Sequence, residues 1–81
     1  MRINIRLFAR LRELASAGEV ALDVSPGLTL GGLTAVLRQR FPRLRDALGS
    51  VAVAVNGETA QPGVILRDGD EVAFLPPFSG G

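Results

Sequence analysis

The stretch Glu71-Val72-Ala73-Phe74-Leu75-Pro76-Pro77 sets the limits of the fold, because it predicts a final β-strand and the point where that strand stops. Residues 71–75 are rich in apolar and aromatic types, as strands are. Pro76 and Pro77 fix φ and remove two backbone donors, so a strand cannot continue its hydrogen bonds beyond Leu75. The sequence therefore predicts a globular domain over residues 1–75 and an extended tail over residues 76–81.

The tail continues through Phe78-Ser79 and ends in Gly80-Gly81. Glycine has no Cβ, so its backbone can approach another molecule closely. Fully extended, residues 76–81 would span roughly 20 Å at about 3.3–3.6 Å per residue. Most chain ends are loose and have no such role. This one follows an apolar strand directly and combines stiff prolines with an aromatic residue, which is not linker composition. We therefore expect an arm that presents the α-carboxylate of Gly81 to another protein.

Length and composition predict one small folded domain. The chain has 81 residues, of which 47% are hydrophobic, so a core is available. No apolar run approaches the roughly 18 residues of a membrane span, and the start shows no signal-peptide pattern. The absence of cysteine fits the cytoplasm, which is the expected location. A net charge of +1 does not favour nucleic acid as a partner.

The residue types that are missing argue against an enzyme that works alone. The chain has no Cys, His or Tyr, and all nine of its basic residues are Arg. The usual nucleophiles and acid–base groups at neutral pH are therefore absent, as are soft and imidazole metal ligands. We expect no metal site, and we expect the reactive group to be the chain terminus.

The first quarter of the chain predicts two strands joined by a short helix. Residues 2–7 alternate strictly between polar and apolar types, which indicates a strand. The same alternation places Phe8 on the polar face, where it is either covered by the next segment or part of a partner surface. Residues 9–15 are good helix formers, with Gly18 as the expected stop. Residues 19–25 alternate again and predict the second strand.

The main helix is predicted over residues 30–41. Thr29 is a suitable N-cap after the Pro26-Gly27 turn, and the residue before Pro42 ends the helix. The apolar positions at helical spacing are Leu30, Leu33, Leu37 and Phe41.

Four arginines cluster near the end of this helix, at positions 38, 40, 43 and 45. Cations there suit the helix dipole, which is the favoured interpretation. The alternative is contact with an anion or an acidic partner.

The second half predicts three more strands. Residues 51–55 are apolar at every position, as in an interior strand covered on both faces. Asn56-Gly57 indicates a type I′ turn. A short edge strand is expected around residues 64–66. Asp68-Gly69-Asp70 precedes the last strand and indicates a turn, because the rest of a calcium loop is missing.

The order is strand, short helix, strand, longer helix, and then three strands. It predicts an α+β protein with a mixed sheet of four to five strands and one main helix on one face. This is the order of the ubiquitin-like β-grasp fold. A ferredoxin-like fold is the weaker alternative because it needs a second full-length helix.

A resemblance to a known family rests on three stretches: Leu7-Phe8-Ala9-Arg10-Leu11-Arg12-Glu13-Leu14, Val53-Ala54-Val55-Asn56-Gly57 and Asp68-Gly69-Asp70-Glu71-Val72-Ala73-Phe74-Leu75-Pro76-Pro77-Phe78-Ser79-Gly80-Gly81. Together, and in this order, they resemble the small, sulfur-carrying subunits of molybdopterin synthase. The last stretch, with its two glycines, is the most specific. The Asp-Gly-Asp-Glu-Val segment alone is a common turn before a strand.

The resemblance implies a cycle in which the chain carries sulfur and binds no cofactor itself. An E1-like adenylyltransferase would use ATP and Mg²⁺ to adenylate the carboxylate of Gly81, and a sulfur donor protein would convert it to a thiocarboxylate. The tail would then enter the large subunit and give sulfur to cyclic pyranopterin monophosphate. Two transfers build the dithiolene of molybdopterin, and the synthase is a heterotetramer of two small and two large subunits. Gly81 would carry the sulfur, Gly80 would allow passage, and Phe78 and Ser79 would line the approach.

The expected partner surface is an apolar patch near the root of the tail, with Phe8 and Leu75 as anchors and Arg12 at the rim. Two other interpretations stay open at this point. One is a sulfur carrier for thiazole synthesis in the thiamine pathway. The other is a ubiquitin-like interaction module, or a modifier that is conjugated to lysines of other proteins.

Overall fold

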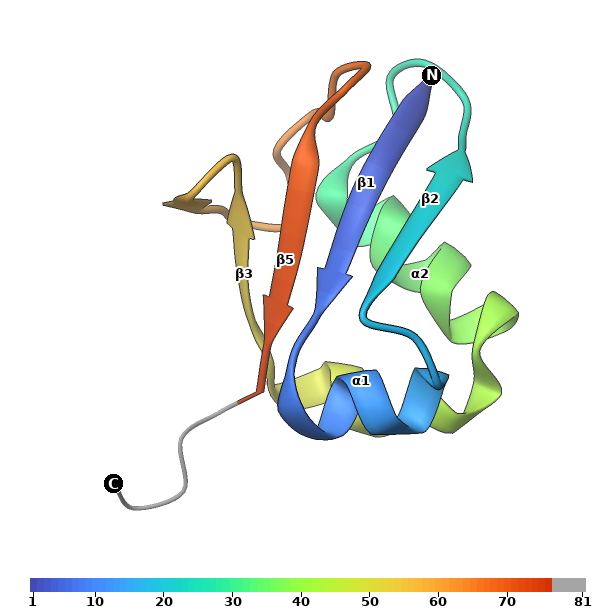
Figure 1. Cartoon of the computed structure of the whole chain (residues 1–81). Helices are drawn as coiled ribbons and strands as arrows, with labels where there is room; N and C mark the ends of the chain where they lie inside the picture. The colour runs from blue at the N-terminus through green and yellow to red at the C-terminus, as the bar shows by residue number, and fades with distance from the viewer. Residues whose placement is uncertain (77–81) are drawn as a thin grey trace.

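The structure, a computed structural model, describes residues 1–76 and shows one mixed sheet in the strand order β2-β1-β5-β3-β4. The elements in chain order are β1 (Arg2–Leu7), α1 (Ala9–Ala15), β2 (Glu19–Asp23), α2 (Leu30–Arg40), the 3₁₀ helices η1 (Pro42–Leu44) and η2 (Ala47–Ser50), β3 (Ala52–Val55), β4 (Glu58–Thr59) and β5 (Glu71–Leu75). Helix α2 crosses one face of the sheet, and α1 lies across its lower end (Figure 1). The α+β class and the β-grasp order are confirmed.

The first and last strands, β1 and β5, are paired at the centre of the sheet. β1 pairs with β2 in antiparallel fashion and with β5 in parallel, so the first and last strands are neighbours. β3 pairs antiparallel with the other side of β5. β5 lies between β1 and β3 and ends at Leu75. The tail therefore continues from the middle of the sheet and not from one of its edges.

The core lies between the sheet and α2. Alternate side chains of β1 and β5 point inward, and Ile3, Val72 and Phe74 are fully buried. Helix α2 presents Leu33 and Leu37 to them, as the helical spacing predicts. No element within residues 1–76 covers the opposite face of the sheet, which carries polar and small side chains and, at the end of β5, Leu75.

The start of α2 is held by its cap and by the chain that crosses it. The Gly32 N–H donates to the Thr29 hydroxyl at 3.2 Å, which confirms the predicted cap. The Leu30 N–H donates to the Val64 carbonyl at 2.8 Å. A Cβ on Gly32 would lie 2.6 Å from a methyl carbon of Leu28, so glycine permits this close packing.

Three expectations are corrected. Helix α1 ends at Ser16, which takes the left-handed conformation (φ 56°), and not at Gly18. The edge strand is β4, whereas residues 64–66 form only an isolated bridge between Ile65 and Thr29. β3 is only half-covered, because its second face lies on the open side of the sheet.

The turn at Asn56-Gly57 is confirmed, since both residues have positive φ, 51° and 84°. The Asn56 amide donates to the Asp70 carboxylate at 2.9 Å, and the Asn56 side-chain oxygen accepts from the Glu71 N–H at 2.9 Å. The Asp70 carboxylate also accepts from the Arg67 N–H. The acidic residues before β5 therefore bind backbone and side-chain donors of turns, as the sequence predicts.

Candidate functional site

The candidate site is the end of the sheet from which the tail continues. β5 stops at Leu75, and Pro76 is the last residue that the structure describes. The predicted tail residues Phe78, Ser79, Gly80 and Gly81 lie outside the described residues. What the structure gives is therefore the surface around the root of the tail.

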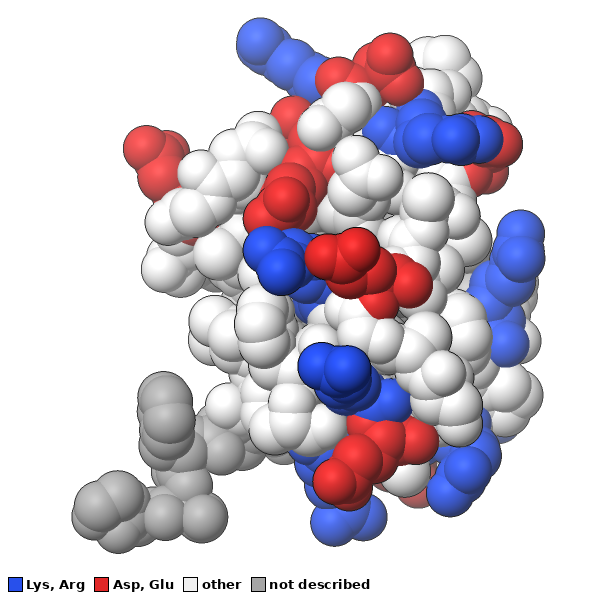
Figure 2. Space-filling view, in the orientation of Figure 1, with Lys and Arg blue, Asp and Glu red and all other residues white. Residues whose placement is uncertain are grey.

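One side of this root is apolar. On the open face of the sheet, Ala52 of β3 pairs with Leu75, and Ala54 pairs with Ala73. Phe8 follows the Leu7–Phe74 pair of β1 and β5, one residue beyond it. These five residues, Phe8, Ala52, Ala54, Ala73 and Leu75, are called the root patch here. Figure 2 shows it as a white area over the lower ends of β3 and β5.

Two of the predicted partner residues are the large side chains of the root patch. Phe8 is 38% exposed and Leu75 is 39% exposed, so the domain covers each of them only in part and leaves an apolar surface open to solvent. Phe8 sits at the N-cap of α1 in extended geometry and does not cap the helix with its side chain. The Arg6 guanidinium lies 5.8 Å from the centre of the Phe8 ring, which places a cation over one face of the aromatic.

The third predicted partner residue, Arg12, borders the patch from α1. Its side chain crosses Gly18, where an added Cβ would come within 3.2 Å of the guanidinium nitrogen Nε. Arg12 and Phe8 line one shallow hollow of about 380 Å³. The structure therefore places Phe8 and Arg12 beside one hollow and Leu75 at the end of β5. The role of these three residues in binding a partner stays a prediction.

Small residues of the patch were not anticipated from the sequence. Ala52, Ala54 and Ala73 keep the patch flat, and their signal is the alternation of small with large apolar residues in residues 51–55 and 71–75. That alternation identifies the open face once the strand register is known.

The other half of the open face is charged. Arg2 forms an ion pair with Asp23 at 3.2 Å, and Arg6 lies 3.5 Å from Glu19 and 3.7 Å from Glu71. The hydrogen bond from Arg2, with its charge, lowers the pKa of the Asp23 carboxyl below its ordinary value. These pairs cross β2, β1 and β5, and they separate the root patch from the far end of the sheet.

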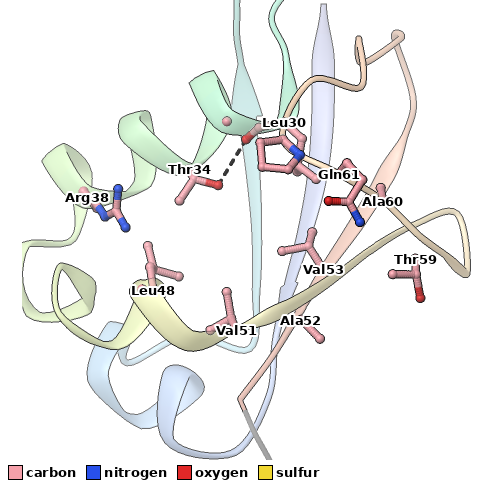
Figure 3. Close-up of a pocket in the computed structure, with 13 residues that line it drawn as sticks. Leu30, Thr34, Arg38, Leu48, Val51, Ala52, Val53, Thr59, Ala60 and Gln61 are labelled. Atoms are coloured by element: carbon pink, nitrogen blue, oxygen red, sulfur yellow. Dashed lines mark hydrogen bonds between the residues drawn. The ribbon is translucent and has the colours of Figure 1, made fainter.

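A second hollow lies on the α2 side of the sheet and shares Ala52 with the root patch. It has a volume of about 490 Å³ between α2, η2, β3 and residues 59–62. Figure 3 shows Arg38 reaching toward it from α2, and the Thr34 hydroxyl donating to the Leu30 carbonyl at 3.1 Å. Arg38 is the one ionisable side chain in its lining, so the hollow offers no acid–base pair.

No group of three or more acidic, His or Cys side chains gathers within residues 1–76 in a way that could hold a metal ion. None of the helices described is both long enough and apolar enough to cross a bilayer.

Comparisons with known proteins identify the family. A model of the ThiS family matches residues 5–81. The chain is 38% identical to the molybdopterin synthase sulfur carrier subunit of Mycobacterium tuberculosis over 82 residues, covering 100% of this chain and 99% of the relative. The crystal structure of SAMP1 from Haloferax volcanii superposes with a TM-score of 0.92 at 32% identity, with 100% of both chains covered.

A further solved structure contains a partner. It is the complex of subunits 1 and 2 of the molybdopterin-converting factor from Helicobacter pylori, which matches with a TM-score of 0.74 at 28% identity and covers 100% of each chain. The family match spans nearly the whole chain, and the Mycobacterium tuberculosis relative matches from end to end. This chain therefore belongs to the ThiS family of ubiquitin-like β-grasp proteins, alongside the sulfur carrier subunits of molybdopterin synthase.

Proposed function

We propose that this chain is the sulfur carrier of a molybdopterin synthase and that the carboxylate of Gly81 is the group that carries the sulfur. The observation that supports this most strongly is the end-to-end similarity to a molybdopterin synthase sulfur carrier subunit, with the ThiS family match running through Gly81. The sequence supplies a second reason, since its inventory of side chains leaves the terminus as the reactive group.

The proposed chemistry begins with activation of a poor acyl donor. A carboxylate oxygen of Gly81 attacks the α-phosphorus of Mg²⁺-bound ATP on an E1-like adenylyltransferase, and pyrophosphate leaves. Sulfide then attacks the acyl carbon, and AMP leaves to give the thiocarboxylate. If a persulfide on the donor protein attacks instead, the product is an acyl disulfide, and a thiol must reduce it to release the thiocarboxylate.

The second stage takes place on the large subunit. The thiocarboxylate sulfur bonds to a side-chain carbon of cyclic pyranopterin monophosphate as the C–O bond at that carbon breaks and its oxygen leaves, on the phosphate or as water. Water then hydrolyses the acyl–sulfur bond, which leaves the sulfur on the pterin and restores the Gly81 carboxylate. Two such transfers supply the dithiolene of molybdopterin in a synthase of two small and two large subunits. Catalytic side chains come from the large subunit, where a cationic group can stabilise the developing charge. In this scheme Gly80 passes through the narrow entrance, and Phe78 and Ser79 line it. We place the cycle in the cytoplasm.

The deciding experiment is intact-protein mass spectrometry. The chain is incubated with its activating enzyme, ATP, Mg²⁺ and a sulfur donor, and its mass is followed. We expect one oxygen to be replaced by sulfur at the C-terminus, and we expect no change after deletion of Gly81 or after addition of one residue behind it. Sulfur incorporated equally by the variant without Gly81 would refute the proposal.

The root patch is proposed as the apolar contact with the large subunit. Phe8 and Leu75 are its exposed large side chains and would act as anchors, with Arg12 at the rim. Truncating either anchor to Ala should weaken binding of the large subunit by about 10-fold or more. Calorimetric titration measures this, and unchanged binding by the Phe8→Ala, Leu75→Ala double variant rejects the role of the patch.

A second candidate function is protein modification. The structure matched with a TM-score of 0.92 is SAMP1, which related structures describe as a small archaeal modifier protein. In that case the Gly81 carboxylate would be joined to lysines of other proteins. Conjugates of a tagged chain in its native cells, absent when Gly81 is deleted, would favour this candidate. The thiamine-pathway carrier stays a weaker alternative, because the full-length relative reported above is a molybdopterin synthase subunit.

A further inference from the structure

The charges of this chain are divided between two ends of the molecule. Residues 9–15 and 38–50 hold six of the nine arginines but only two of the eight acidic residues. These segments form α1, the last turn of α2, η1 and η2, which lie together at the lower end of the sheet (Figure 1). Blue side chains appear along the lower and right margins of Figure 2, next to that end. The rest of the chain holds the other three arginines and the other six acidic residues, so positive charge is concentrated at this end although the whole chain carries only +1.

The arginines of this end are not neutralised within the described domain. All ion pairs that the structure shows among residues 1–76 involve Arg2 or Arg6, which lie on the open face of the sheet. The helix dipole accounts for Arg38 and Arg40, which lie in the last turn of α2. The dipole of α1 does not account for Arg10, which is not in the last turn of that helix. Arg43 lies in η1, which has three residues and is too short for a sizeable dipole.

Two of these arginines lie beside the root of the tail. Arg10 and Arg43 line a hollow of about 410 Å³ together with Pro76, the last described residue. Leu11 and Leu14 contribute apolar surface to it, and among the described residues that line it Asp46 is the one with an acidic side chain. Both arginines are exposed to solvent. The tail therefore leaves the domain between the root patch on one side and a cationic hollow on the other.

We propose that this basic end, with Arg10 and Arg43 at its centre, docks on an acidic surface that surrounds the tail entrance of the large subunit. The inference rests on the proposed function, because it is the tail that brings this end of the domain against a partner. Acidic side chains of the partner enter the hollow beside Pro76, and Arg38, Arg40 and Arg45 add long-range attraction.

Such an arrangement has a kinetic consequence. A dipolar carrier is turned by the field of an acidic partner so that its basic end, and with it the tail root, arrives first. Steering of this kind raises association rates by about 10–10³-fold and weakens as salt is added. The Debye length falls from about 10 Å at 0.1 M salt to about 3 Å at 1 M salt, so the effect should be lost across that range.

The test compares two variants with the same change in net charge. Arg10→Gln combined with Arg43→Gln removes two positive charges from the basic end. Arg67→Glu makes the same change of two charges near the turn before β5, at the opposite end of the sheet, and the Arg67 side chain makes no hydrogen bond or ion pair in the structure. Stopped-flow association with the large subunit from the same organism is measured between low salt and 1 M salt.

We expect the double Gln variant to associate about 10-fold more slowly than the wild type at low salt, and Arg67→Glu to change the rate less than about 2-fold. The difference should vanish at 1 M salt, and the corresponding Lys variant should recover most of the rate. Equal slowing by the two charge-matched variants overturns the proposal, as does slowing that persists at high salt. Circular dichroism establishes that each variant is folded.

Failure of this inference can be told apart from failure of the proposed function. If the wild-type chain does not bind the large subunit at all, the proposed function fails, and this inference fails with it. If the wild type binds and the double Gln variant binds at the same rate, only the acidic docking surface is refuted. An RNA that binds the wild-type chain more tightly than the large subunit does, at physiological salt, would assign the basic end to nucleic acid instead.

Discussion

At the scale of single residues, the positions that matter most are those where a side chain replaces a missing backbone contact. Thr29 caps α2, and Asn56 holds a left-handed turn while bonding to Asp70 and Glu71. The cap and the turn were both predictable from the sequence. Thr is a preferred residue at the N-cap of a helix, and Asn-Gly is the preferred pair in a type I′ turn. Ser16 was not predictable, because a Gly stands two residues later and is the usual residue in that conformation.

Thr29→Ala removes the cap of α2 and leaves the Gly32 N–H without its side-chain acceptor. We expect the free energy of unfolding to fall by about 1 kcal/mol in urea titrations followed by circular dichroism. Thr34→Ala is the matched control, because the Thr34 hydroxyl bonds within the helix to the Leu30 carbonyl and Ala is the better helix former. Equal losses in the two variants would contradict the capping role.

The Arg2–Asp23 pair predicts a pH dependence. In the folded state the pKa of the Asp23 carboxyl lies below its ordinary value of 3.8. The charged Asp23 therefore adds to the free energy of unfolding above pH 3.8, and this stabilisation is lost as the pH falls through the lower folded pKa. Asp23→Asn should therefore be less stable than the wild type at pH 7, and the gap should close in acid. Urea titrations over a pH series measure it, with Glu58→Gln as the control, since Glu58 forms no ion pair in the structure.

At the scale of elements, regular patterns gave correct predictions and irregular ones did not. Strict alternation located β1, and the apolar run before the prolines located β5. The segment around residues 64–66 was wrongly predicted to be an edge strand, because its backbone groups, with that of Pro62, form hydrogen bonds with residues at the start of α2. The Pro62 and Val64 carbonyls accept from the first N–H groups of that helix, and the Leu66 N–H donates to the Leu28 carbonyl. Such long-range pairing leaves no periodic trace in a sequence.

Strand β5 has two faces with different roles, and adjacent residues separate them. Phe74 is fully buried, so Phe74→Ala should lower the free energy of unfolding by about 3–5 kcal/mol. Leu75 points to the open face, so Leu75→Ala should change stability far less and should instead weaken binding to the large subunit. Denaturant titration and calorimetry on both variants check this. A loss of stability as large for Leu75→Ala as for Phe74→Ala would show that the root patch is part of the fold.

At the scale of the whole molecule, the sequence predicted the β-grasp arrangement because the order of the main strands and helices follows from their residue patterns, although the end of α1 and the edge strand were misplaced. The partner surface was only partly predictable. Phe8 was identified because it breaks the alternation of β1, but the flat alanines beside it depend on strand register. The basic end was only partly predictable: the arginines at positions 38, 40, 43 and 45 already cluster in the sequence, but only the fold brings Arg10 and Arg12 of α1 beside them.

The boundary between domain and tail gives a whole-molecule prediction. All buried apolar side chains of residues 1–76 lie between Ile3 and Phe74. A chain that stops at Pro76 should therefore have a free energy of unfolding within about 0.5 kcal/mol of that of the full-length chain. It should be unable to receive sulfur. Thermal and urea unfolding of both chains measure the first point, and intact mass measures the second. A clearly less stable truncated chain would move the domain boundary beyond residue 76.

The position of β5 between β1 and β3 affects folding during synthesis, because this central strand is the last of the five strands of the sheet to be translated. Until residues 71–75 have emerged, the nascent chain can form the antiparallel pairs β1–β2 and β3–β4, but it lacks the strand that joins these two pairs into one sheet. A message that is cut short before this point yields a product without its middle strand, which we expect to be cleared by proteases. We therefore expect the molecules that fold stably to be those translated at least as far as the strand from which the tail continues.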